Sequence, residues 1–183
     1  MTELRAAVAA RRSYSRVTTE APGHDELLAL VSAAGRIADH SALQPWRIIE
    51  LRGNARVRLG EAFVEASGET SQSAAKLAAK PQRAPLLLAI VAARRPSEKV
   101  PKWEQDAVAA GVAHMLSLLL DDAGWGVMWR TGNLTRAKAV NRMHGVAKHE
   151  RLLGWLYVGG VPAGNRSGPR KPVDAERFLS TIE

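Results

Sequence analysis

One apolar run limits the folds open to this chain more than any other feature. Residues 83–95 read RAPLLLAIVAARR, a continuously apolar stretch with arginines at both ends. A run of that length predicts a β-strand that is buried on both faces, because a half-exposed strand would alternate apolar and polar side chains. The sheet around it must therefore be covered on both sides, and helices are the elements that we expect to cover it.

Other segments supply the remaining strands and helices of such a sheet. Further strands are predicted for residues 44–53, 124–132 and 152–160. Helices are predicted for residues 2–10, from His24 or Asp25 to about Gly35, for 54–80 with breaks at Gly60 and Gly68, for 103–123, and from Thr135 onward. Because Gln44 precedes a proline, we expect it to be extended. The predicted fold class is α+β: an α/β/α sandwich with one mixed sheet and helices on both faces.

The helix predicted over residues 103–123 is apolar around most of its circumference. Only Gly111, His114 and Ser117 interrupt the apolar residues between positions 107 and 120. A helix of this kind is buried on all sides, either in a core or in an oligomer interface. The pattern therefore favours a homodimer.

Length and composition favour a single domain. A chain of 183 residues, 46% hydrophobic and 24% charged, suits a single domain over residues 1–183. The absence of cysteine excludes disulfides, thiolate catalysis and cysteine-ligated zinc. The first residues are too charged for a signal peptide, and the most apolar runs are shorter than the ~20 residues of a membrane span. We therefore expect a cytoplasmic protein with no membrane partner.

The formal net charge of +8 favours an anionic partner such as a nucleotide, a nucleic acid or an acidic lipid. The cationic side chains are dispersed over separate predicted elements, whereas nucleic-acid binders more often carry one dense basic stripe. A basic nucleic-acid-binding protein remains the rival interpretation. It predicts a colourless protein whose affinity falls steeply with salt.

Several familiar catalytic and metal-binding motifs are absent from the sequence. There is no G-x-S-x-G elbow, no Walker A loop and no G-x-G-x-x-G after a predicted strand. His144 and His149 stand five positions apart, which is off the i, i+4 register of one helix face. For these two residues, and for His24 and His114, a core or surface position is favoured over metal ligation.

Four short segments remain, and their order along the chain is informative. They are RRSYSR (11–16), RIADHSALQPWRI (36–48), WRTG (129–132) and GVPAGNRSGPRKP (160–172). Together they resemble the FMN-dependent nitroreductase family, over most of the chain. The VPKWEQ segment at 100–105 makes the sequence most similar to the compact bacterial NAD(P)H nitroreductases. The resemblance implies a nitroreductase-like sandwich, an intertwined homodimer and a bound FMN at the subunit interface.

The resemblance assigns the first basic segment to the cofactor. It implies that Arg11 and Ser13 contact the phosphate or ribityl end of FMN, and that Arg12 approaches the pyrimidine side of the ring. Both ends of FMN favour cationic donors, because the phosphate is a dianion and the reduced ring is anionic. Arginine suits such sites because its planar fork can bond two acceptors at once.

The second segment is implied to serve the flavin of the other subunit. Arg36 and His40 resemble residues that reach across the dimer, although a helix-end cap is an equal alternative for His40. Gln44, together with Pro45 and Trp46, is expected to shape the ring pocket rather than to react.

The last two segments supply further cofactor contacts. The resemblance implies that Trp129 flanks the flavin ring and that Arg130 and Thr131 reach toward its phosphate. Arg170 and Lys171 are weaker candidates for the phosphate, and a solvated tail is at least as favoured for them.

The implied activity is that of an NAD(P)H-dependent oxidoreductase. Hydride would pass from NAD(P)H to flavin N5, and from there to a nitroaromatic, a quinone or another unsaturated acceptor, in a ping-pong scheme. No side chain is assigned as general acid, general base or nucleophile, because the cofactor carries the chemistry. The same fold and cofactor could instead serve dehalogenation, ring fragmentation or dehydrogenation.

Overall fold

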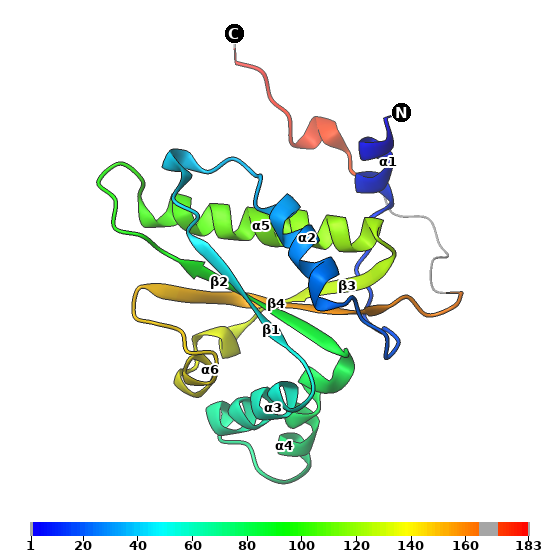
Figure 1. The fold of residues 1–183 in the computed structure, drawn as a ribbon, viewed down its shortest axis with the longest axis vertical. Coiled ribbons are helices and arrows are strands. Elements are labelled where there is room, and N and C mark those ends of the chain that lie inside the picture. The colour runs from blue at the N-terminus through cyan, green and yellow to red at the C-terminus, as the bar shows by residue number, and fades with distance from the viewer. Residues whose placement is uncertain (1, 165–171, 183) are drawn as a thin grey trace.

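The computed structural model describes residues 2–164 and 172–182, and one four-stranded sheet forms its centre (Figure 1). The strands are β1 (Trp46–Leu51), β2 (Leu86–Ala93), β3 (Trp125–Arg130) and β4 (Glu150–Gly160), in the order β1-β2-β4-β3. The expected α+β class is confirmed. The sheet is antiparallel at all three pairings, however, and not mixed. Strands β2 and β3 run parallel to each other, as a crossover helix requires, but β4 lies between them and opposes both.

Helices cover both faces of the sheet, as expected (Figure 1). On one face lie α2 (His24–Ala34) and α5 (Lys102–Asp122), and on the other lie α3 (Asn54–Ser67), α4 (Ser71–Ala78) and α6 (Lys138–Met143). A first helix, α1 (Glu3–Ala10), buries no side chain. Short 3-10 turns are η1 (His40–Ala42), η2 (Lys80–Arg83), η3 (Asn133–Arg136) and η4 (Ala175–Arg177).

Strand β2 is the centre of both cores. All eight of its residues are buried. Leu86, Leu88 and Ile90 belong to the core beneath α2 and α5, while Leu87 and Val91 belong to the core beneath α3. This alternation explains why the run contains no polar position, and the prediction of a strand buried on both faces is confirmed.

The helical region after β1 breaks at one of the two predicted glycines. Gly68 has a φ of +66° and ends α3, as a left-handed C-terminal residue does. Gly60 lies inside α3, where an added Cβ would stand 2.3 Å from the carbonyl oxygen of Ala78. The prediction of a break at Gly60 was therefore wrong, because this glycine allows α3 to approach the end of α4. The helix predicted from Thr135 instead begins at Lys138, after η3.

The turn that enters β1 also differs from the expectation. Gln44 has a φ of +47° and not the extended geometry predicted for a residue before proline. Its backbone N–H donates to Oδ2 of Asp39 at 2.7 Å. This local hydrogen bond holds the turn against the steric preference of the Gln44–Pro45 pair.

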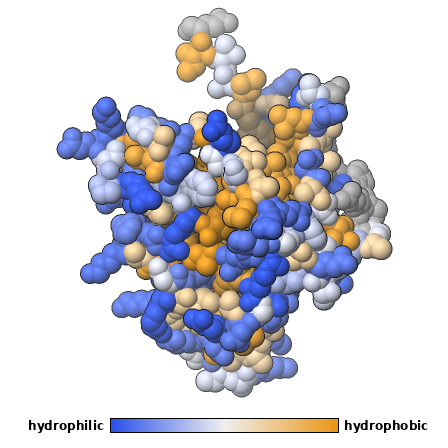
Figure 2. Space-filling model, viewed as in Figure 1, coloured by the Kyte–Doolittle hydropathy of each residue, from blue (hydrophilic) through white to orange (hydrophobic). Residues whose placement is uncertain are grey.

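Helix α5 is buried along one face and open along the other. Val112 and Leu116 are fully buried against the sheet, whereas Trp103 is 70% exposed and Met115 and His114 are also exposed. The chain alone does not bury the helix on all sides, so its role in an oligomer interface stays a prediction. A hydrophobic band crosses the centre of the face drawn in Figure 2, between hydrophilic flanks.

A charged pair joins the ends of two strands on different sides of β2. Arg47 donates from Nε to Oε1 of Glu150 and from Nη2 to Oε2, both at 2.7 Å. Oε2 also accepts the backbone N–H of Ala147 at 2.9 Å. These bonds lower the pKa of Glu150 from its ordinary 4.5 to about 2, chiefly through the hydrogen bonds from Arg47 and against the effect of burial.

This pKa predicts acid sensitivity. Because the pKa of Glu150 is lower in the folded than in the unfolded chain, its stabilisation is complete above about pH 4.5 and is lost as the pH falls toward about 2. We expect Glu150→Gln to lower the free energy of unfolding at pH 7 while having little effect near pH 2. Urea unfolding at a series of pH values measures both. An equal loss at all pH values would contradict the prediction.

Among the described helices, none combines the length and the hydropathy that a membrane crossing requires.

Candidate functional site

The first basic segment lies beside the edge strand β3. After α1 ends at Ala10, the backbone N–H of Tyr14 donates to the carbonyl oxygen of Val127 at 3.0 Å, and the Tyr14 side chain is buried. This contact holds Arg11, Arg12 and Ser13 at the side of the sheet. Both arginines are half-buried, and Ser13 is exposed.

Two glycines allow the chain to cross the sheet after this contact. A Cβ at Gly126 would stand 3.0 Å from Val17, and one at Gly159 would stand 2.7 Å from the same side chain. The N–H of Thr18 then donates to the carbonyl oxygen of Gly160 at 2.8 Å. Gly126 and Gly159 are therefore packing sites that fix the path of the residues after Ser13.

The far end of β3 opens into a cavity of about 450 Å³. The predicted residues Trp129, Arg130 and Thr131 line it. Three aromatic side chains contribute to its walls: Phe63, Trp155 and Tyr157. They come from α3 and β4, so the cavity lies where the α3 layer meets the sheet edge. The Trp129 ring lies on the other face, where its centre is 4.8 Å from that of His114 on α5. A cavity with this lining suits a flat aromatic ligand.

Positive charge surrounds the same cavity. Lys80, Arg83 and Arg130 line it, and the lining contains no Asp or Glu from the described part of the chain. The guanidinium carbon of Arg130 lies 5.1 Å from the centre of the Tyr157 ring. Burial raises the pKa of Tyr157 to about 12 despite these cations, so its hydroxyl keeps its proton at neutral pH. Such a cavity favours a ligand that carries or acquires negative charge.

Lys80 and Arg83 were not predicted from the sequence. They belong to η2, directly before the buried strand β2. The signal that could have found them is their place at the entry to the central strand. Surface lysines and arginines are common, however, and the cavity becomes evident only when η2 is seen beside β3.

Two side-chain donors of cavity-lining residues are buried without a partner: Nε1 of Trp129 and Nε of Arg130. A buried donor without an acceptor costs free energy, so such atoms mark places where a ligand can contribute. The pyrimidine side of a flavin ring offers oxygen and nitrogen acceptors, and it becomes anionic on reduction. The aromatic walls, the cations and the donors therefore fit a flavin ring.

The other predicted residues gather at the opposite edge of the sheet. Nδ1 of His40 lies 2.9 Å from Oε1 of Glu104 near the start of α5. Arg36 follows α2 and is exposed, and Gln44 is bonded to Asp39 in the turn before β1. The side chain of His40, the first residue of η1, therefore connects this short helix to α5.

One chain does not bring the two groups together. His40 is bonded to Glu104, whereas Arg12 borders a hollow with Asp121 at the other end of α5. At ~1.5 Å per residue these two helix positions are about 26 Å apart. Strands β2 and β4 also separate β1 from β3. Arg170 and Lys171 lie outside the described residues.

Both ring nitrogens of His144 have hydrogen-bond partners within the protein. Nδ1 of His144 lies 2.8 Å from the carbonyl oxygen of Val140, and Nε1 of Trp155 donates to its Nε2 at 3.0 Å. Burial lowers the pKa of His144, so the ring is neutral in this arrangement. The predicted core position is thus confirmed for His144, which is 6% exposed. Within residues 2–164 and 172–182, no group of three or more His, Asp or Glu could hold a metal ion.

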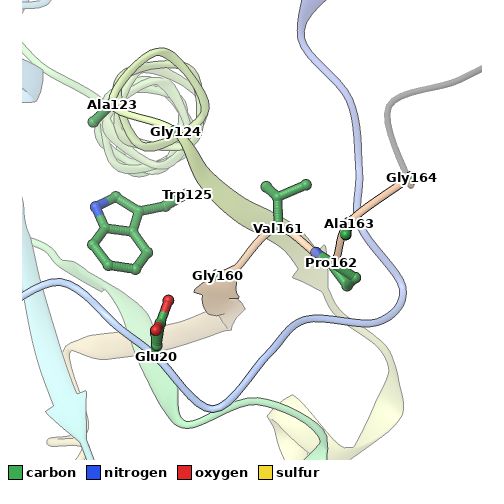
Figure 3. A pocket seen from close by; sticks show the side chains of 9 residues that line it. All are labelled: Glu20, Ala123, Gly124, Trp125, Gly160, Val161, Pro162, Ala163 and Gly164. Atoms are coloured by element: carbon green, nitrogen blue, oxygen red, sulfur yellow. The ribbon is translucent and has the colours of Figure 1, made fainter.

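A second hollow lies at the opposite end of β3, as Figure 3 shows. It has a volume of about 760 Å³, and none of the sequence-predicted site residues lines it. Its lining includes Glu20 and Trp125, and Nε1 of Trp125 donates to Glu26 at 2.6 Å. Among the residues that the structure describes, the lining of this hollow carries a carboxylate and no cation.

Comparisons with known proteins identify the family of the chain. Residues 8–160 match the model of the Nitroreductase family. A relative from Escherichia coli K12, named "Putative NAD(P)H nitroreductase YdjA", is 32% identical over 152 residues, which cover 81% of this chain and 83% of the relative.

Solved structures share the fold at lower identity. A nitroreductase-like family protein from Bacillus cereus has a TM-score of 0.83 at 22% identity, covering 100% of this chain and 97% of that one. A mutant of NfnB, an FMN and NADPH-dependent nitroreductase from sphigopyxis sp. strain HMH, has a TM-score of 0.78 at 16% identity, covering 98% of this chain and 99% of that one.

Proposed function

Because the chain belongs to the nitroreductase family, we propose that it is an FMN-dependent oxidoreductase that uses NAD(P)H to reduce a nitroaromatic, quinone or other unsaturated acceptor. The observation that carries the proposal is the aromatic, cationic cavity at the end of β3, with its two unpartnered donors. Bound FMN would supply the hydride chemistry, and the protein would supply binding, orientation and electrostatics. We also propose a cytoplasmic location, in keeping with the family to which the chain belongs.

The two ends of the cofactor have separate binding groups in this proposal. The ring would lie in the cavity beside Arg130 and Tyr157, where Lys80 and Arg83 would stabilise the negative charge that reduction creates. Arg11 and Ser13 would hold the phosphate end. The strand residues from Val127, which fixes the first group, to Thr131 span about 13 Å at ~3.3 Å per residue. That separation suits a ligand with a ring at one end and a phosphate at the other.

A second copy of the chain would complete the site. If α5 of the partner runs antiparallel along the open face of α5, its Arg36, His40 and Gln44 come to the C-terminal end of the first copy's α5, where Arg12 lies. Exposed apolar side chains support this dimer. Trp103 on α5 is exposed, and residues 172–182 are all exposed and extend away from the sandwich beside α1 (Figure 1). Phe178 and Leu179 in that segment are more than three-quarters exposed, which a dimer contact would relieve.

The absorbance spectrum of the purified protein tests the cofactor. We expect flavin bands, at roughly one FMN per chain after reconstitution and desalting, that bleach when NAD(P)H is added without oxygen. Activity with a panel of nitroaromatics and quinones then tests the acceptor class. A protein that retains no flavin after reconstitution overturns the proposal. Salt-sensitive binding of DNA or RNA by that colourless protein would favour the rival interpretation.

A further inference from the structure

A second basic cavity, also of about 450 Å³, lies at the N-terminal end of α5. It is lined by Arg94, Arg95, Pro96, Lys102, Lys148 and His149. Lys102 is the first residue of α5, and the other residues come from two loops. One loop lies between β2 and α5 and the other before β4, on the same side of the molecule in Figure 1. That flank is hydrophilic in Figure 2. Within residues 2–164 and 172–182, no acidic residue is part of the lining.

The backbone of the first loop is fixed by a buried amide. Gln105 is 1% exposed, and its Oε1 accepts the N–H of Arg95 at 2.7 Å. Its Nε2 donates to the carbonyl oxygens of Arg95 and Val100, both at 3.0 Å. A side chain that makes three hydrogen bonds inside the protein holds the loop in one conformation. Arg95 and Lys102 are therefore presented by a preorganised backbone.

The second loop is held by the Arg47–Glu150 pair. Glu150 accepts the N–H of Ala147, and Nη2 of Arg47 also donates to the carbonyl oxygen of Gly145 at 3.1 Å. These bonds fix the backbone on both sides of Lys148. Both walls of the cavity are thus built before any ligand arrives, which reduces the entropy cost of binding.

The nearby acids are already neutralised by other arginines. Asp106 accepts two hydrogen bonds from Arg94, and Nη1 of Arg151 lies 3.9 Å from the same carboxylate. Glu150 is paired with Arg47. Among the described residues, no ion pair is formed by Arg95, Lys102 or Lys148. The cavity therefore keeps a net positive charge, and the N-terminal end of the α5 dipole adds to it.

We propose that this cavity binds the 2′-phosphate of NADPH and makes NADPH the preferred hydride donor. The inference rests on the proposed function, in which His40 reaches the flavin of the partner subunit. His40 is bonded to Glu104, so the cavity at Lys102 lies at the same end of α5. A nicotinamide ring stacked on that flavin would extend its adenosine end outward, where fixed cations meet the phosphate. NADH has no phosphate at this position, so these cations do not strengthen its binding.

The direct test is calorimetric binding of 2′,5′-ADP and of 5′-AMP to the FMN-loaded protein. These probes differ at the 2′-phosphate and need no turnover. We expect 2′,5′-ADP to bind on the order of tenfold more tightly or better, as a charge-assisted contact provides. In the Arg95→Gln/Lys148→Gln variant this difference should disappear. The Arg95→Lys/Lys148→Arg variant should restore most of it, and Lys76→Gln on the exposed surface of α4 should change nothing.

Steady-state kinetics supply the second readout. We expect kcat/KM for NADPH to fall on the order of tenfold in the double glutamine variant, with kcat/KM for NADH unchanged. Equal affinity for the two probes, an equal fall with both donors, or a wild-type preference for NADH would each overturn the inference. If the probes bind as expected but NADPH does not bleach the flavin, the phosphate cavity stands while the proposed oxidoreductase function fails.

Discussion

A Gly154→Ala substitution is expected to lower the free energy of unfolding by about 2–3 kcal/mol, as overpacking of a core does, and to impair flavin binding as well. An added Cβ would lie 2.5 Å from the carbonyl oxygen of Arg130 and 2.7 Å from Nε1 of Trp129. Neither atom can retreat easily, because one is backbone and the other belongs to a packed indole. Gly154 also lies at an irregularity in the pairing of β4 with β2, where small residues are common.

Gly145→Ala is the matched control for this effect. Gly145 has a φ of +60°, and nothing lies within 4 Å of the Cβ that a substitution would add. Its cost is therefore backbone strain alone, roughly 1 kcal/mol. Urea unfolding of both variants, with the FMN content after reconstitution and desalting, gives the comparison. If Gly154→Ala is no less stable than Gly145→Ala, the close approach of β4 to Trp129 is not a determinant of stability.

The layers of the fold were predictable because burial leaves a local signature. The apolar run of β2 has no polar position on either face, so its sequence pattern alone indicated a sheet covered on both sides. The order of the strands leaves no such signature. Nothing in the residues of β4 indicates that it pairs between β2 and β3, and the mixed sheet was a wrong prediction for that reason.

Local departures from the usual backbone preferences could not be predicted from the sequence either. Proline restricts the residue before it, yet Gln44 adopts a positive φ because Asp39 accepts its N–H. The role of Asp39 depends on a turn that has no regular pattern. Positions 60 and 68 are both glycine, and both lie in one predicted helical region. Only the approach of α3 to the end of α4 distinguishes the packing glycine from the one that ends the helix.

The candidate site was predictable as a set of segments but not as an arrangement. The sequence indicated residues 11–13 and 129–131. The second group forms the end of β3 and the residue after it, and the fold brings the first group beside this strand. The sequence could not indicate Lys80 and Arg83. Their proximity to β3 depends on where the fold places η2.

Substitution of Arg11 by glutamine is expected to weaken FMN binding by on the order of ten- to a hundredfold, the effect of losing a charged hydrogen bond to a phosphate. His40→Ala should weaken it about tenfold in the same assay, although His40 lies near the opposite end of α5 from Arg12. Fluorescence titration of the apoprotein with FMN measures both effects. Arg58→Gln, an exposed arginine on α3, serves as the control and should bind FMN normally.

Subunit mixing then separates a shared site from two self-contained ones. In a dimer of one Arg11→Gln chain and one His40→Ala chain, a shared arrangement places both substitutions in one site and leaves the other intact. Co-expressed chains with different tags, isolated by two affinity steps, should therefore bind one FMN per dimer with wild-type affinity. If Arg11 and His40 serve the same flavin from one chain, each site of the mixed dimer carries one substitution and neither regains affinity. The wild-type affinity of the mixed dimer is thus the result that only a composite interface can produce, and its absence would refute the arrangement proposed for α5.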